Sequence, residues 1–251
     1  MTMEISNERA QVVERTGGAS NECRFSIVIP VLNEQDQINS LIEHLHSQSY
    51  EAACEIIVAD GDPQGRTIKV IRDENVTSLT SKRGRASQMN AGAELAHGEV
   101  LIFLHADTKL PPNALEKISQ VLEDAKYVGG AFDLGIGSDR LFLKYIAARA
   151  RLRSRLNRIP YGDQAIFIRR SYFNKIGRFK EIPLMEDVEL MRRIKKRGDK
   201  IFILRDRVKT SARRWENEGI IYTTLKNQVL INLYYLGISP DKLAKYYRRP
   251  S

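Results

Sequence analysis

The chain has 251 residues, enough for one large α/β domain or two small ones with a sizeable core. Its 40 lysine and arginine residues against 31 acidic ones give a formal net charge of +9, which favours anionic partners such as nucleotides, an acidic membrane surface or nucleic acid. No apolar stretch approaches the ~20 residues of a membrane span. Cys23 and Cys54 have neither metal-site nor disulfide-framework spacing, so a cytoplasmic location is expected.

Apolar strand patterns alternate with helical patterns through the first half of the chain. The run 25–31 predicts a buried strand, and apolar residues at positions 38, 41, 42 and 45 predict a helix after it. Further strands are predicted at 55–59, 76–79 and 100–104, and further helices at 67–72, 86–96 and 114–122. This alternation predicts a parallel sheet with right-handed crossovers.

The second half of the chain is less regular. Predicted strands cover 129–134, 164–169 and 200–204, and predicted helices cover 139–156, 171–176, 187–196 and most of 220–247. No linker rich in proline, glycine or serine separates the two halves. A single domain over residues 24–251 is therefore expected, after a flexible tail at 1–23.

The most apolar run of the chain, Val100 to Leu104, leads into His105-Ala106-Asp107. Such a run is typical of a strand buried on both faces, and open α/β sheets place their ligands at the carboxyl ends of such strands. Asp107 at that position can hold a divalent cation against a phosphate. The same aspartate can instead only cap the following turn, and the tripeptide alone does not decide between the two.

Four features follow one another along the chain: Asp60 and Asp107 at strand ends, Glu186-Asp187 at a helix start, and Arg213-Arg214-Trp215 after the last strand. In this order they resemble the family 2 glycosyltransferases of the GT-A fold, above all a compact bacterial subgroup with a His-Ala-Asp metal motif. The resemblance rests on seven segments, at 29–34, 58–62, 85–93, 104–108, 162–165, 185–190 and 213–215. It implies an α/β fold with a mostly parallel central sheet flanked by helices and a helical C-terminal extension. It also implies a nucleotide-sugar-binding half at 24–125 and an acceptor-binding, catalytic-base half at 126–251.

The resemblance implies a hexosyltransferase-like enzyme that moves a sugar from a UDP- or GDP-linked donor to an acceptor hydroxyl, with inversion at the transferred carbon. Asp107 is the expected ligand of a Mn²⁺ or Mg²⁺ cofactor, which stabilises the departing diphosphate together with basic side chains. Asp187 is the expected general base, with Glu186 as its catalytic neighbour. Both acids could instead simply favour the positive end of a helix. The glutamine of the Gln-x-x-Arg-Trp motif of processive synthases is absent before Arg214, which predicts a non-processive enzyme.

The remaining site residues are assigned by the same resemblance. The predicted donor-binding residues are Pro30, Glu34, Asp60, Asp62, Arg85, His105, Ala106 and Arg214. The predicted acceptor-binding residues are Asp163, Gln164 and Trp215. His105 replaces the aspartate that is common at the first position of the metal motif. It is expected to contact phosphate or support Asp107, because a neutral imidazole is not a preferred ligand of a hard cation.

The segment 140–158 is basic and carries apolar residues at intervals, which predicts an amphipathic helix. That helix could lie on an anionic membrane, as suits a lipid-linked acceptor, cover the active site, or be a solvated face. A peripheral position at the inner face of the membrane is thus the alternative to a free cytoplasmic one. The acceptor is accordingly either a small molecule or a lipid-linked compound.

Two other functions compete with sugar transfer. A nucleotidyltransferase on a related fold would need a glycine-rich phosphate loop after the first strand, where residues 31–35 read Val-Leu-Asn-Glu-Gln. A non-enzymatic basic module that binds RNA would explain the charge but not the carboxylates at strand and helix ends. A nucleic acid partner is therefore not expected.

Overall fold

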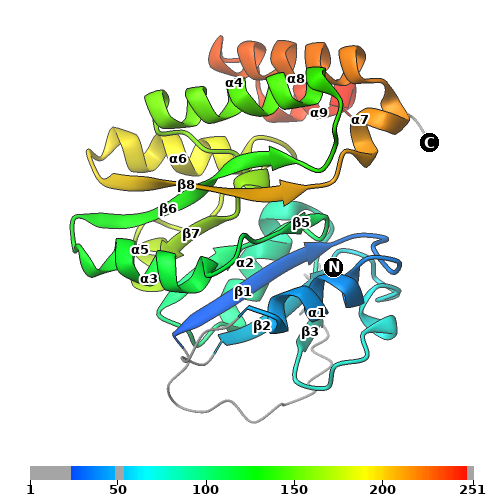
Figure 1. The fold of residues 1–251 in the computed structure, drawn as a ribbon, viewed down its shortest axis with the longest axis vertical. Coiled ribbons are helices and arrows are strands. Elements are labelled where there is room, and N and C mark those ends of the chain that lie inside the picture. The colour runs from blue at the N-terminus through cyan, green and yellow to red at the C-terminus, as the bar shows by residue number, and fades with distance from the viewer. Residues whose placement is uncertain (1–23, 49–53, 248–251) are drawn as a thin grey trace, which may run out of the picture.

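The computed structural model describes residues 24–48 and 54–247. The tail predicted at 1–23 lies outside these described residues. The described strands form one eight-stranded sheet in the order β3-β2-β1-β4-β7-β6-β8-β5, flanked by helices (Figure 1). The predicted fold class, an α/β fold with a mostly parallel central sheet, is confirmed.

Parallel strands build the amino-terminal half of the sheet. Its elements are β1 (Phe25–Val31), α1 (Ile38–His46), β2 (Cys54–Asp60), the short 3₁₀ turn η1 (Ile68–Val70), β3 (Thr77–Thr80), α2 (Arg85–Leu95) and β4 (Val100–Phe103). β1 pairs in parallel with both β2 and β4, in a register that sets Val31 beside Asp60 and Val28 beside Phe103. The carboxyl ends of these three strands therefore meet at one edge, where α/β sheets hold their ligands.

An antiparallel strand joins this half to the second one. The remaining elements are β5 (Thr108–Lys109), α3 (Ala114–Glu123), β6 (Tyr127–Ile136), α4 (Leu141–Asn157), η2 (Gly162–Gln164), β7 (Ile166–Arg169), α5 (Arg170–Lys175), α6 (Glu186–Lys196), β8 (Lys200–Thr210), α7 (Arg213–Glu218), α8 (Ile220–Tyr235) and α9 (Pro240–Tyr247). β7 runs antiparallel between β4 and β6, while β6 and β8 pair in parallel. Helices α4, α8 and α9 gather at the end of the molecule opposite β2 and β3 (Figure 1).

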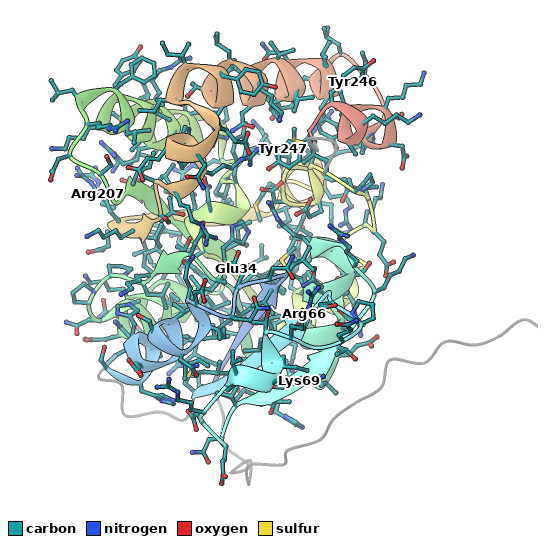
Figure 2. All side chains as sticks on the ribbon, turned by 90° about the vertical axis from the view of Figure 1, so that its right-hand side faces the viewer. Glu34, Arg66, Lys69, Arg207, Tyr246 and Tyr247 are labelled. Atoms are coloured by element: carbon teal, nitrogen blue, oxygen red, sulfur yellow. The ribbon has the colours of Figure 1, made fainter. Side chains whose placement is uncertain are left out.

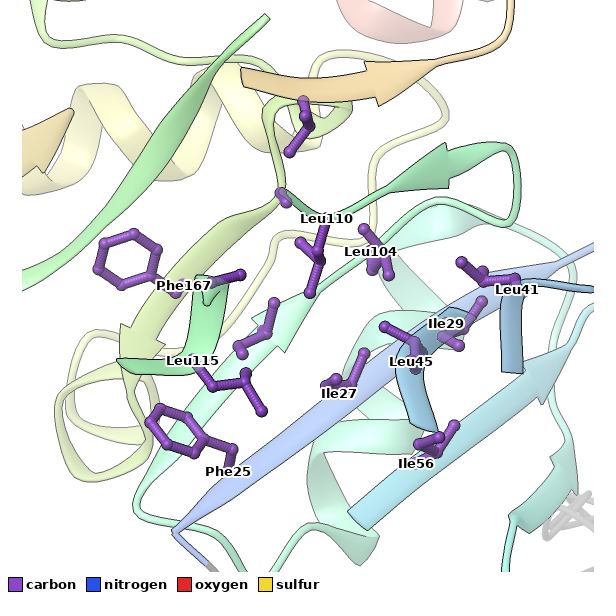
Figure 3. Close-up of a cluster of buried hydrophobic side chains, with 14 of the residues drawn as sticks. Phe25, Ile27, Ile29, Leu41, Leu45, Ile56, Leu104, Leu110, Leu115 and Phe167 are labelled. Carbon is purple, nitrogen blue, oxygen red and sulfur yellow. The ribbon is translucent and has the colours of Figure 1, made fainter. Parts of the chain in front are cut away.

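Both faces of the central strand β1 are buried, which explains its continuous apolar sequence. Phe25, Ile27 and Ile29 of β1 belong to one core cluster together with Leu41 and Leu45 of α1 (Figure 3). Val28, between them in the strand, packs into a second cluster on the opposite face. Truncating a buried side chain of this kind to alanine typically costs about 2–5 kcal/mol, so this double-sided core holds the ligand edge of the sheet rigidly in place.

Several elements differ in extent from their predictions. The strand predicted at 200–204 continues to Thr210, because it pairs with β6 along its whole length across a register shift after Phe132. Gln164 lies in η2 and the strand begins only at Ile166, while the helix predicted at 67–72 is the single turn η1. In the part of the chain that the structure describes, no helix is long and apolar enough to cross a membrane.

Candidate active site

A cavity of about 340 Å³ opens at the carboxyl ends of β1 and β4. Five of the predicted donor-binding residues line it, namely Pro30, Glu34, Arg85, His105 and Ala106. The predicted metal ligand Asp107 lines it as well. In Figure 2, Glu34 lies near the middle of the molecule, below Tyr247 of α9, which borders the same cavity.

A second cavity of about 230 Å³ adjoins the first. Besides Arg85, His105 and Asp107, its walls contain five residues predicted for catalysis or for binding: Asp163, Glu186, Asp187, Arg214 and Trp215. The two cavities share wall residues, namely Arg85, His105, Asp107, Leu184, Glu186 and Tyr247. The fold thus brings the sequence-distant motifs around one two-part cleft, with the strand-end loops on one side and α6 and α7 on the other.

Asp107 stands at the junction of the two cavities, in the loop that leaves β4. Its Oδ1 accepts a hydrogen bond from the Thr108 hydroxyl at 3.2 Å. Among the described residues, no three aspartate, glutamate, histidine or cysteine side chains are grouped so that they could bind a metal ion without other ligands. Mg²⁺ and similar ions are commonly bound by one or two carboxylates together with substrate phosphates. A single carboxylate facing a cavity fits that kind of shared coordination.

Asp187 is held by backbone groups from two elements. Gly162 N–H of η2 donates to its Oδ2 at 2.6 Å, and Val188 N–H of α6 donates to its Oδ1 at 2.7 Å. These two bonds fix the carboxylate in the cavity wall. Glu186 beside it is buried, and its carboxylate lies 3.9 Å from the Arg85 guanidinium. Burial and the neighbouring charge of Asp187 raise the pKa of Glu186, so Glu186 retains a proton more readily than an ordinary glutamate.

Two polar atoms in the wall of the second cavity lack hydrogen-bond partners among the described residues. They are Oδ1 of Asp163 and Nε1 of Trp215. Burial, together with the nearby charge of Asp187, raises the pKa of Asp163 to about 6. Buried polar atoms are nearly always bonded in folded proteins. Both atoms are therefore suited to a hydroxyl-bearing ligand, the indole N–H as donor and the carboxyl oxygen as acceptor.

His105 is neutral in this setting. Burial and the adjacent Arg85 guanidinium lower its pKa to about 3. A methyl group built on Gly162 would lie 3.0 Å from His105 Nε2 and 3.4 Å from Asp187 Oδ2. His105 therefore packs against the turn that holds the predicted base, and its predicted contact with phosphate would be a hydrogen bond from a neutral imidazole.

Three predicted binding residues form hydrogen bonds within the protein. Asp60 has no exposed surface, and its two carboxylate oxygens accept N–H bonds from Asp62 at 2.9 Å and Thr67 at 3.0 Å. Asp62 accepts from the Arg66 side chain at 2.6 Å. Gln164, also without exposed surface, donates to Phe132 O at 2.8 Å. None of the three lines either cavity, and their direct contact with a ligand stays a prediction.

Tyr247 and Gly162 border the site but were not predicted as site residues, although Gly162 begins the segment 162–165 on which the resemblance rests. Tyr247, at the end of α9, accepts a hydrogen bond from Arg214, whose guanidinium also lies 4.4 Å from the tyrosine ring centre. It thereby orients the arginine predicted to bind the donor. No local pattern marks Tyr247, since its place in the cleft depends on the path of three helices. Gly162 carries a weak signal, as a glycine directly before the polar pair 163–164.

Residues 26–180 match the family described as Glycosyl transferase family 2. The dolichol-phosphate mannosyltransferase of Pyrococcus furiosus is 26% identical over 127 residues, which is 46% of this chain and 33% of that protein. The undecaprenyl-phosphate 4-deoxy-4-formamido-L-arabinose transferase of Yersinia pestis is 31% identical over 120 residues, or 43% of this chain and 36% of that protein. The matched region thus spans about a third of each of these relatives.

Solved structures agree on the fold. Residues 1–349 of S. aureus TarS match 89% of this chain and 70% of that chain with a TM-score of 0.59 at 15% identity. The same fragment in complex with UDP-GlcNAc matches 75% of this chain and 58% of that chain, with a TM-score of 0.58 at 18% identity. At this identity the likeness concerns the fold alone. The family match covers more than half of the chain, and it confirms the predicted class of enzyme at the level of the family: this chain belongs to glycosyl transferase family 2.

Proposed function

We propose that this protein transfers a sugar from a nucleoside-diphosphate sugar to an acceptor oxygen, one sugar at a time. The observation that carries the proposal is the two-part cleft, in which Asp107 stands between a cavity lined by strand-end loops and a cavity lined by Asp187. A donor in the first cavity would present its sugar to an acceptor in the second. In this proposal the half predicted at 24–125 would bind mainly the donor and the half predicted at 126–251 mainly the acceptor, although residues of both halves line each cavity.

The chemistry follows from the placement of charge around the cleft. The bond between the sugar C1 and the diphosphate oxygen breaks, and its electron pair leaves with the diphosphate. The guanidinium groups of Arg85 and Arg214 line the cleft and would stabilise that negative charge. The acceptor oxygen forms the new bond to C1, and its proton passes to the Asp187 carboxylate. A single displacement of this kind inverts the configuration at C1.

A divalent cation, Mn²⁺ or Mg²⁺, would be held by Asp107 and the donor phosphates. When bound, it supplies further positive charge against the leaving diphosphate. Arg85 and Arg214 act on the same diphosphate through their own charges. Glu186, whose pKa is raised by burial and by Asp187, would orient the acceptor while Asp187 takes the proton.

We further propose a lipid-linked acceptor. The names of the Pyrococcus and Yersinia relatives each combine a sugar transferase with a polyprenyl phosphate. The unpartnered Trp215 N–H in the second cavity suits an oxygen-rich acceptor head group. Such an acceptor would bring the protein to the inner face of a membrane as a peripheral protein.

Thermal-shift titration tests the donor site without knowledge of the sugar. UDP and GDP would each be titrated with Mn²⁺ or Mg²⁺, and binding raises the melting temperature in proportion to RT ln(1 + [L]/Kd). We expect one nucleotide to raise it in a metal-dependent manner, and Asp107→Asn to remove the metal dependence. Asp139→Asn, at an exposed carboxylate outside the cleft, is the matched control. Absence of any shift over a wide range of concentrations would contradict the donor site.

A further inference from the structure

The helix α4 presents its apolar stripe to solvent. Leu141, Tyr145, Leu152 and Leu156 recur at intervals of three to four residues or their multiples and are all exposed, Leu141 at 82% and Leu156 at 71%. The opposite side of the helix packs on β6 and contains the buried residues Leu143, Ala147 and Ser154. An amphipathic helix normally turns its apolar stripe toward the protein core. The stripe of α4 faces solvent instead, uncovered by any described residue, which indicates a surface that binds another molecule.

The helix α8 repeats this arrangement. Ile221, Leu225, Val229 and Leu236, just past the end of the helix, form an outward stripe, with Ile221 66% and Leu236 80% exposed. The buried side of α8 contains Leu230 and Ile231, and both line the second cavity of the active site. One face of α8 thus borders the cleft while the other faces solvent.

Both stripes lie at the same end of the molecule. Figure 1 and Figure 2 each place α4 and α8 along the end opposite β2 and β3, and Tyr246 of α9, 75% exposed, lies at that end as well. We call this surface the apolar end face; it consists of the outward stripes of α4 and α8 together with Tyr246. Large exposed apolar patches on soluble domains mark interaction surfaces.

The charge around the apolar end face identifies the partner. Neither α4 nor α8 contains an aspartate or a glutamate, whereas α4 carries five lysine or arginine residues. Of these, Lys144 and Arg149 are exposed beside the leucine stripe, Lys144 within 3.2 Å of the fully exposed Asp139, whereas Arg155 bonds to the buried Asp133 of β6. Aliphatic side chains flanked by cations, on a helix too polar to span a membrane, are the combination that inserts into the headgroup region of an anionic bilayer.

A second copy of the chain fits this surface less well. Symmetric contact through α4 would place its cations opposite the same cations of the partner, with no acidic residue of α4 or α8 to neutralise them. We propose that the apolar end face docks on the surface of an anionic membrane, with α8 between the bilayer and the cleft. The functional reason for this docking rests on the proposed lipid-linked acceptor. With α8 on the bilayer, the lipid headgroups would lie next to the second cavity, where that acceptor would bind.

Co-sedimentation with vesicles tests the docking directly. The full chain would be mixed with vesicles of equal parts phosphatidylglycerol and phosphatidylcholine, and in parallel with vesicles of phosphatidylcholine alone. We expect binding to the anionic vesicles that weakens with added salt. The double variant Leu152→Ser/Leu225→Ser should lower the partition coefficient about tenfold, and Arg149→Gln should lower it about fivefold.

The matched control lies at the other end of the molecule. Lys69→Gln/Val70→Ser changes an exposed cation and an exposed aliphatic residue far from the apolar end face (Figure 2), and it should bind vesicles as the unchanged chain does. Equal binding by Leu152→Ser/Leu225→Ser and the control would overturn the proposal. So would a dimer of the unchanged chain, seen by light scattering, that this double variant converts to a monomer. The nucleotide-dependent thermal shift, measured on the same variant, separates a failure of docking from a failure of the donor site.

Discussion

Replacing Asp60 by asparagine should destabilise the protein and weaken donor binding together. The buried Asp60 carboxylate accepts two backbone N–H bonds, one on each oxygen. An asparagine has one side-chain oxygen, so one of the two N–H groups would face an amide NH₂ and remain buried without an acceptor. A hydrogen bond to a charged group contributes about 1.5–3 kcal/mol, and an unsatisfied buried donor costs about 1–3 kcal/mol. We therefore expect a loss of about 3 kcal/mol in the free energy of unfolding.

The Asp60→Asn substitution should also alter the wall of the donor cavity, through the contacts that link Asp60 to Thr67 and Thr67 to Glu34. Thr67, whose N–H bonds to Asp60, accepts a hydrogen bond from Glu34 N–H at 3.2 Å through its hydroxyl. Glu34 lines the donor cavity and pairs with Arg213 at 3.0 Å. Loosening the loop at Thr67 therefore displaces Glu34 and should lower nucleotide affinity.

Thermal and urea unfolding measure the first effect. For a chain of this length, ~3 kcal/mol corresponds to a fall of roughly 6–12 °C in melting temperature. Titration of the folded variant with UDP or GDP measures the second. Asp62→Asn is the matched control for stability, because the Asp62 carboxylate bonds to the half-exposed Arg66 side chain and to two N–H groups of its own loop, so its loss should lower the free energy of unfolding much less. Equal stability of the Asp60→Asn variant and the unchanged protein would refute the reasoning.

Three further changes probe the base, the turn that holds it and the distant edge of the sheet. Asp187→Asn should lower the rate of transfer by about 10²–10⁴-fold, the usual contribution of a positioned general base, with nucleotide-dependent thermal shifts retained; loss of those shifts would assign Asp187 to donor binding instead. Gly162→Ala should lower the rate roughly tenfold at unchanged nucleotide affinity, because its new methyl group would press on His105 and Asp187; an unchanged rate would show that the turn adapts freely. Glu55 is partly buried, which raises its pKa, but hydrogen bonds from the Ser26 hydroxyl and two backbone N–H groups lower it below 4.5 overall. Its contribution to stability is therefore present above that pH and lost as the pH falls further, and Glu55→Gln should flatten the decline in melting temperature below pH 4.5; an identical decline in both proteins would contradict this.

The strands of the sheet could be predicted because their apolar runs are continuous. Phe25–Val31 and Val100–Phe103 are buried on both faces. A strand buried in this way is apolar at nearly every position and not only at alternate ones. The strand β8 was predicted too short, since its second part alternates exposed and buried residues around charged side chains. The two-residue strand β5 has no pattern of its own and exists only through its pairing with β8.

The cleft could be predicted in outline but not residue by residue. The sequence does not distinguish an aspartate that faces a cavity from one that accepts hydrogen bonds from the backbone. Asp107 is of the first kind and Asp60 is of the second. The sequence likewise predicts that α4 is amphipathic without revealing that its leucines face outward. Tyr247 reaches the cleft only through the packing of α7, α8 and α9. These placements depend on tertiary contacts, which local sequence patterns do not encode.

The transfer reaction itself is the most direct test of sugar transfer in this cleft. UDP- and GDP-sugars would be incubated with Mn²⁺ or Mg²⁺ and a polyprenyl-linked sugar, whose hydroxyl groups carry the proton that Asp187 would accept. Both the nucleoside diphosphate released and the glycosylated lipid would be measured. We predict that the unchanged protein forms both products in equal amounts, with inverted configuration at C1. We also predict that Asp107→Asn abolishes turnover and that Asp187→Asn lowers it by about 10²–10⁴-fold, with both variants remaining folded. Full activity of either folded variant would contradict the assignment of the catalytic site.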